Sequence, residues 1–120
     1  MTMRVVHLAI YPEKGAPGVD LSTVAVEQEG LAGDRRKKAA IHLVTMPDMD
    51  QDDPPRANIV VDTAGTDLES LVGQQLQLGT VTLGVTQRPS NCPGIYADVI
   101  RPGQVSVGDD IDVTAPDQTD

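Results

Sequence analysis

Hydrophobic residues recur at every second position over most of this 120-residue chain. Successive side chains of a β-strand point to opposite faces, so this spacing is typical of strands with one buried face. The apolar segments are short, and glycine, proline and aspartate, which favour turns, separate them. The pattern predicts an all-β domain, either a barrel or a sandwich. We favour a closed or partly open β-barrel with one or two short helices.

Roughly eight strands are expected from this spacing. Segment 57–61 is too apolar to alternate and predicts a strand that is covered on both faces. A hairpin is expected around Gly79-Thr80, and a last pair of strands around Gly108-Asp109. The alternating residues of the other strands are Val6, Leu8 and Ile10; Val24 and Val26; Ile41 and Leu43; Leu76 and Leu78; Val81, Leu83 and Val85; Val105 and Val107; and Ile111 and Val113.

Two short helices are expected. Thr66 and Glu69 have the spacing of a capping box, and Gly73 would end the helix that they begin. A second helix is expected from Pro93 to Ile100, because proline suits the first helical position. The acidic segment from Pro47 to Pro55 instead predicts an exposed, mobile loop.

The length and composition are those of one domain with an aliphatic core. The chain has no phenylalanine or tryptophan, and its two tyrosines are Tyr11 and Tyr96. Valine, leucine and isoleucine must therefore fill the interior. We expect the domain to span residues 1–114 and to be followed by a frayed tail over residues 115–120.

Charge and hydropathy exclude several classes of partner. A formal net charge of -9 opposes binding to nucleic acids and to anionic membranes, and the chain has few aromatic rings to stack on bases. No apolar segment approaches the roughly 20 residues that span a bilayer, and the first residues lack a secretory signal. We therefore expect a cytoplasmic protein with no nucleic-acid or membrane partner.

Cys92 is the only cysteine, and it lies among prolines and small polar residues that favour an exposed loop. A helix that begins at Pro93, together with the nearby Arg88, would lower the pKa of the thiol below its usual value of about 8.5. Burial would raise that pKa, and a free cysteine is often an inert core residue. Both interpretations stay open, a reactive thiol and a structural one.

Four of the nine basic residues are consecutive, at positions 35–38, in an otherwise acidic chain. Gly30 and Gly33 allow the preceding backbone to turn, and Asp34 could accept hydrogen bonds from that turn or orient an arginine. The basic segment, which consists of Arg35, Arg36, Lys37 and Lys38, is either an anion site or a charged edge strand that resists aggregation.

Two other polar residues flank the expected strand at 57–61. Arg56 and Asn58 could point into the region of the basic segment, or they could make strand-end hydrogen bonds. His7 and His42 are the only histidines, and both lie in expected strands among apolar neighbours. We assign them no role, because too few ligands are present for a zinc site and a packed histidine is commoner than a general base.

Taken together, these motifs resemble the MOSC domain, which is named after the C-terminal domain of molybdenum cofactor sulfurase. Their order and spacing match the family over nearly the whole chain, although many relatives have histidine in place of Arg36 and a helix in the region of 47–55. The motifs are Gly30-Leu31-Ala32-Gly33-Asp34-Arg35-Arg36, Pro55-Arg56-Ala57-Asn58-Ile59-Val60-Val61, the hairpin at Gly79, Cys92 with Gly94-Ile95-Tyr96-Ala97, and Val105-Ser106-Val107-Gly108-Asp109.

The resemblance implies a β-barrel in which Cys92 either carries sulfur as a persulfide or ligates the molybdenum of a pterin cofactor. It also implies binding of molybdenum ion or pyridoxal phosphate, and a partner such as a cysteine desulfurase that donates sulfur, or a molybdenum-cofactor enzyme. By the same resemblance, the residues expected to bind the cofactor are Asp34, Arg35, Arg36, Lys37, Arg56 and Asn58.

Three functions follow from these patterns. The first is an enzyme, a sulfur transferase or a molybdenum-cofactor-dependent catalyst, in which Cys92 reacts or ligates. The second is a binding module that holds a pterin cofactor or an anionic metabolite without turnover. The third is an interaction domain in which Cys92 is buried and inert.

Overall fold

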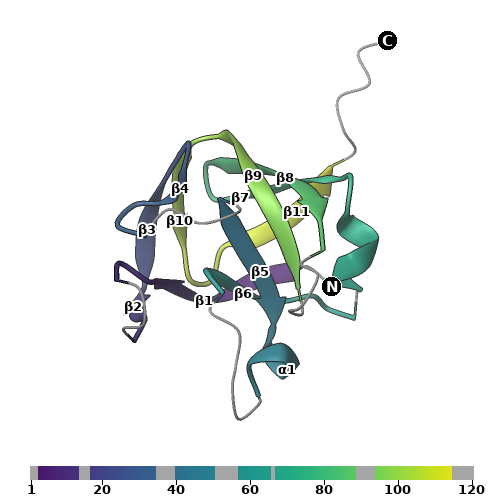
Figure 1. The fold of residues 1–120 in the computed structure, drawn as a ribbon. Helices are drawn as coiled ribbons and strands as arrows, with labels where there is room; N and C mark the ends of the chain where they lie inside the picture. The colour runs from purple at the N-terminus through teal and green to yellow at the C-terminus, as the bar shows by residue number, and fades with distance from the viewer. Residues whose placement is uncertain are drawn as a thin grey trace.

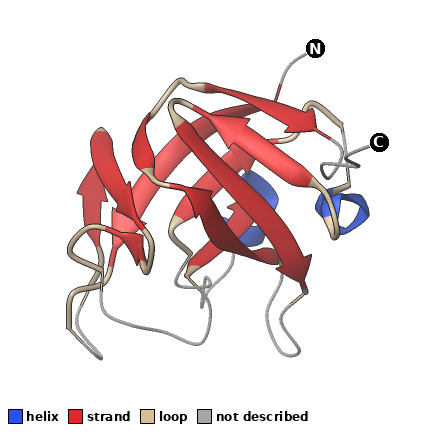
Figure 2. Ribbon diagram, turned by 90° about the horizontal axis from the view of Figure 1, so that it is seen from above, coloured by secondary structure: helices blue, strands red, loops and turns tan. Residues whose placement is uncertain are grey.

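The computed structural model describes residues 3–13, 17–34, 40–50, 57–65, 67–88 and 94–114. The expected tail at 115–120 lies outside these residues. Strands dominate, and two single-turn helices accompany them (Figure 2). The elements are β1 (Met3–Ile10), β2 (Val19–Leu21), β3 (Thr23–Glu27), β4 (Gly30–Leu31), β5 (Ile41–Thr45), α1 (Met46–Met49), β6 (Ile59–Asp62), the 3-10 helix η1 (Leu68–Leu71), β7 (Gln75–Leu78), β8 (Val81–Gln87), β9 (Ile95–Arg101), β10 (Gly103–Ser106) and β11 (Asp110–Thr114).

Seven of the described strands close into a barrel. Their order is β11-β7-β8-β9-β5-β6-β1, and β1 pairs again with β11, where Met3 is opposite Ile111. Neighbouring strands are antiparallel except for β5 and β6, which are parallel. Figure 1 shows β5 and β9 crossing the front of the barrel, with α1 at the end of β5. The predicted all-β barrel is confirmed.

A smaller sheet lies at one side of the barrel (Figure 1). It has the order β10-β3-β4, and Val105 of β10 is opposite Val24 of β3. The prediction that residues 105–107 pair with residues 111–113 is therefore wrong, because β11 pairs with β7 and β1 instead. A tight turn from Ser106 to Asp109 takes the chain from one sheet to the other.

The interior is aliphatic, as the composition predicted. Ile41, Leu43 and Ile59 are among its fully buried side chains. A second cluster, which we call the outer cluster, lies on the other face of β5 and β6 and consists of Val44, Ala57 and Val60 with Val6 and Met49 packed against them. Strand β6 is thus covered on both faces, as expected for segment 57–61.

A β-bulge in β1 changes which residues face the interior. The register against β6 shifts between Val5 and His7, so Val5 and Leu8 both face the core while Val6 joins the outer cluster. The prediction that Val6 shares a face with Leu8 is therefore wrong. The extra residue of a bulge interrupts the alternation on which that prediction rested.

The prediction of a helix from Pro93 to Ile100 is wrong. Residues Ile95–Arg101 form β9, which pairs with both β5 and β8. The buried side chains of β9 are those of Ile95, Ala97 and Val99, which recur with the period of a strand. This period outweighs the preference of a single proline for a helix start.

Two other expectations about helices need correction. The first helix is the 3-10 helix η1, and its cap is Asp67, whose Oδ1 accepts a hydrogen bond from the Glu69 amide at 3.1 Å. Thr66, the expected cap, lies outside the described residues. The acidic segment is not all loop, because α1 begins at Met46, and Thr45 and Asp48 form a capping box there. Within the described ranges, neither helix is long and apolar enough to cross a bilayer.

Candidate functional site

Asn58 joins three parts of the chain through one buried amide. It lies just before β6 and has no exposed surface. Its Oδ1 accepts a hydrogen bond from the His42 amide at 3.0 Å. Its Nδ2 donates to Asp34 Oδ2 at 3.0 Å and to the Ala9 carbonyl at 3.4 Å. Since its backbone also bonds to Ala9 and His42, Asn58 fixes the end of β1 against the middle of β5.

Asp34 completes this network from the turn after β4. Its Oδ1 accepts a hydrogen bond from the Tyr11 amide at 2.7 Å, while its Oδ2 accepts the one from Asn58. The Asp34 amide donates to the Leu31 carbonyl, which closes the turn itself. The structure therefore brings together two of the residues that the sequence assigned to a site, and it uses both to hold neighbouring backbone.

Gly94 packs tightly against β5. Its φ is +95°, a conformation that favours glycine, and a Cβ there would collide with the Leu43 carbonyl and lie 2.7 Å from Val44 Cγ1 and 3.0 Å from His42 Nε2. The chain that follows Cys92 thus enters β9 directly over the outer face of β5. No other residue type fits this position without displacing a neighbour.

The other predicted site residues lie in three segments outside the described residues. These segments are 35–39, with Arg35, Arg36 and Lys37; 51–56, with Arg56; and 89–93, with Cys92. Each segment has one described border residue near residues 42–44 of β5, and these three are Asp34, Ala57 and Gly94. Asp34 is joined to His42 through Asn58, Ala57 packs with Val44 in the outer cluster, and Gly94 contacts the same stretch of β5.

His42 is packed, as the sequence analysis expected. The residue is 7% exposed, and its ring meets that of Tyr96 edge-on, with the centroids 5.2 Å apart. Alternation along β5 places His42 on the face opposite Ile41 and Leu43. That face is where the borders of the three segments meet.

One of the two expected causes of a low Cys92 pKa is removed by this fold. Residues Ile95–Arg101 form a strand, so the helix that was expected to supply positive charge does not form there. Arg88 pairs with Glu69 of η1, with its Nη1 3.0 Å from Glu69 Oε1, and both side chains are more than half exposed. A low pKa of the Cys92 thiol stays a prediction.

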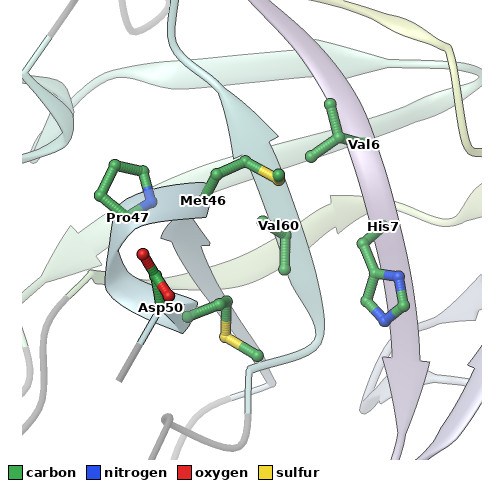
Figure 3. Close-up of a pocket in the computed structure, with 7 residues that line it drawn as sticks. Val6, His7, Met46, Pro47, Asp50 and Val60 are labelled. Atoms are coloured by element: carbon green, nitrogen blue, oxygen red, sulfur yellow. The ribbon is translucent and has the colours of Figure 1, made fainter.

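An open pocket of about 740 Å³ lies beside this region, on the outer side of the barrel. Helix α1 forms one wall and β1 the other, with Val60 of β6 between them (Figure 3). The residues that line it are Val6, His7, Met46, Pro47, Met49, Asp50 and Val60. Among the described residues, no group of three or more histidine, cysteine, aspartate or glutamate side chains could hold a metal ion.

Solved structures with the same architecture exist. YuaD from Bacillus subtilis superposes with a TM-score of 0.75 at 21% identity, and the match covers 98% of each chain. YiiM from Escherichia coli gives 0.66 at 19% identity over 95% of this chain and 71% of YiiM. This chain has the fold of YuaD and YiiM. YiiM from Geobacillus stearothermophilus gives 0.69 at 16% identity over 93% of this chain and 75% of that one. No family model matches this chain, and no curated protein is significantly similar in sequence.

Proposed function

We propose that this chain is a MOSC-type protein in which Cys92 carries sulfur or ligates the molybdenum of a pterin cofactor. Two independent lines support the family. The motifs from Gly30 to Arg36 and from Pro55 to Val61 resemble it, and the fold is shared with YuaD and YiiM, which are small MOSC-type proteins.

The proposal rests on the positions of Asp34, Ala57 and Gly94, which border the three segments outside the described residues and lie around residues 42–44 of β5. Consecutive Cα atoms are about 3.8 Å apart and two residues span at most about 7 Å. Arg35 and Arg56 are each bonded to a described border residue, and Cys92 is two residues from Gly94. We therefore propose that the thiol and the two guanidinium groups serve one site near this part of β5, where the arginines would engage the phosphate of a cofactor.

The arginines and the thiol would have different chemical roles. An arginine can engage a phosphate through two parallel hydrogen bonds. A cysteine thiolate is a soft ligand for molybdenum. As a sulfur carrier, the Cys92 thiolate would attack the terminal sulfur of a donor persulfide, such as that of a cysteine desulfurase. The new S–S bond makes Cys92 a persulfide, and the donor leaves as a thiolate.

We assign Asp34 and Asn58 a positioning role in place of the cofactor-binding role that the sequence predicted. Asn58 is fully buried, and both of its Nδ2 bonds go to protein groups. Asp34 accepts bonds from Tyr11 and Asn58 at the residue directly before the basic segment. Together they hold the backbone from which Arg35 extends.

Changing Cys92 to serine should abolish sulfur loading from a persulfide donor and retention of molybdenum, because serine has no soft, nucleophilic sulfur. The measurement is the molybdenum, pterin and persulfide content of both proteins after expression with molybdate. The urea midpoint of unfolding serves as the control and should be unchanged. A Cys92 thiol that is alkylated only after denaturation would make the cysteine structural and reject the proposal. Bound pterin that survives in Cys92→Ser would indicate a binding module.

Changing Arg35 and Arg36 together to glutamine should weaken binding of inorganic phosphate by about 2–4 kcal/mol, if each charged hydrogen bond contributes roughly 1–2 kcal/mol. Isothermal titration calorimetry measures the loss. The matched control changes the exposed residues Arg4 and Arg101 to glutamine, which alters the net charge equally on strands β1 and β9. Equal weakening by both double variants would show a general charge effect and no anion site.

A further inference from the structure

The pocket between α1 and β1 has a chemistry opposite to that of the basic segment. Seven described residues line it, of which five are apolar, and two of these are the methionines Met46 and Met49. The polar residues of this described lining are His7 and Asp50, and it contains no lysine or arginine. In a chain with a net charge of -9, this pocket does not suit a phosphate or a carboxylate.

Contacts within the protein hold both walls of the pocket in place. The capping box of Thr45 and Asp48 fixes α1, and the β-bulge turns Val6 outward toward the helix. On the opposite wall, His7 is held by its 3.0 Å bond to Asp20 Oδ1. The volume of about 740 Å³ is within the range of small-molecule sites, roughly 300–1,000 Å³.

The methionines indicate what kind of molecule fits. Met46 is 58% exposed, although it is an apolar residue on a helix of four residues. Met46 and Met49 are three positions apart, which places them on the same side of the helical turn, and both line the pocket (Figure 3). Thioethers are flexible and make favourable contacts with aromatic rings. A lining of this kind suits an aromatic ring.

Asp50 indicates the charge of that molecule. It caps the end of α1, its side chain is exposed, and it is the one carboxylate among the described residues that line the pocket. A cationic group beside it would gain an ion pair, whereas an anionic group would meet like charge. We propose that this pocket binds an aromatic amine, with the ring against Met46, Met49 and Val60 and the protonated nitrogen toward Asp50. This inference does not depend on the role of Cys92.

Three naphthalene probes test the proposal on the full chain: 1-naphthylmethylamine, 1-naphthylmethanol and 1-naphthoate. Nuclear magnetic resonance titration should shift the amides of Val6, Met49 and Val60. The amine should bind about two- to five-fold more tightly than the alcohol, the range expected of an exposed ion pair, and 1-naphthoate should bind most weakly. Failure of all three probes to shift these amides at millimolar concentration would overturn the proposal.

Two variants and two controls make the test specific. Asp50→Asn should remove the preference for the amine, whereas Asp112→Asn, with the same charge change on β11 outside the pocket lining, should keep it. Met46→Gln should weaken all three probes several-fold without unfolding the protein, because Met46 is exposed. An amine preference that survives Asp50→Asn contradicts the proposal. Cys92→Ser should bind the probes like the wild type, so failure of the proposed function would leave this result intact.

Discussion

Changing Asn58 to alanine is expected to lower the free energy of unfolding by about 3–5 kcal/mol, since a lost buried hydrogen bond costs roughly 1–3 kcal/mol when its partner stays unpaired. The substitution removes the acceptor of the His42 amide and the donor to Asp34 Oδ2 and Ala9. It also leaves a cavity where a fully buried side chain stood. Urea unfolding followed by circular dichroism measures the loss.

The control for this prediction is Gln77→Ala. Gln77 also has an amide side chain and also lies on a barrel strand, but its side chain is exposed on β7. Its replacement should change stability by no more than about 0.5 kcal/mol. Similar losses in the two variants would mean that the network around Asn58 contributes nothing beyond an ordinary surface amide.

Changing Gly94 to alanine should cost about 3–5 kcal/mol and should change the alkylation rate of Cys92 in the folded protein. Two effects add at this position. A positive φ costs alanine roughly 1–2 kcal/mol. The new Cβ would also collide with the Leu43 carbonyl and approach Val44 and His42, so the chain that follows Cys92 has to move away from β5.

Gly108 separates these two effects. Its φ is +97°, close to the +95° of Gly94, but a Cβ there would have no atom within 4 Å. Gly108→Ala should therefore cost only the roughly 1–2 kcal/mol of backbone strain and should leave Cys92 alkylation unchanged. If both variants lose the same stability, the packing of Gly94 against β5 contributes little.

Local periodicity was enough to predict the barrel. It failed where the pairing between strands decides which face a residue occupies or whether a segment is a strand. Strands β7 and β8 alternate regularly, so their inward faces could be predicted. The bulge at Val6 could not, because it is defined by the register of β1 against β6. Likewise, a proline suggested a helix where Ala97 pairs with Ile41 of β5 on one side and with Val85 of β8 on the other.

The candidate site could be predicted only in part, because its contacts also join residues that are distant in sequence. Residue types and a family resemblance pointed to Asp34 and Asn58, but not to the hydrogen bond between them, which joins positions 24 residues apart. Nor could sequence show that Asn58 is fully buried, which changes its expected role from binding to positioning. That His42 is packed could be expected from its apolar neighbours in sequence, whereas its contact with the Tyr96 ring depends on the pairing of β5 with β9.

Barrel closure through β1 and β11 also bears on how the chain folds. Met3 and Ile111 pair across nearly the full length of the described chain. Contacts between such distant residues carry a large loop-closure entropy and slow the folding of β-rich domains. The network of Asn58 joins β1 to β5 and β6 without β11, so the N-terminal strand can be held in place before the last strand arrives. Until then, β7 and the Met3–Arg4 end of β1 present unpaired edges, and such edges favour aggregation.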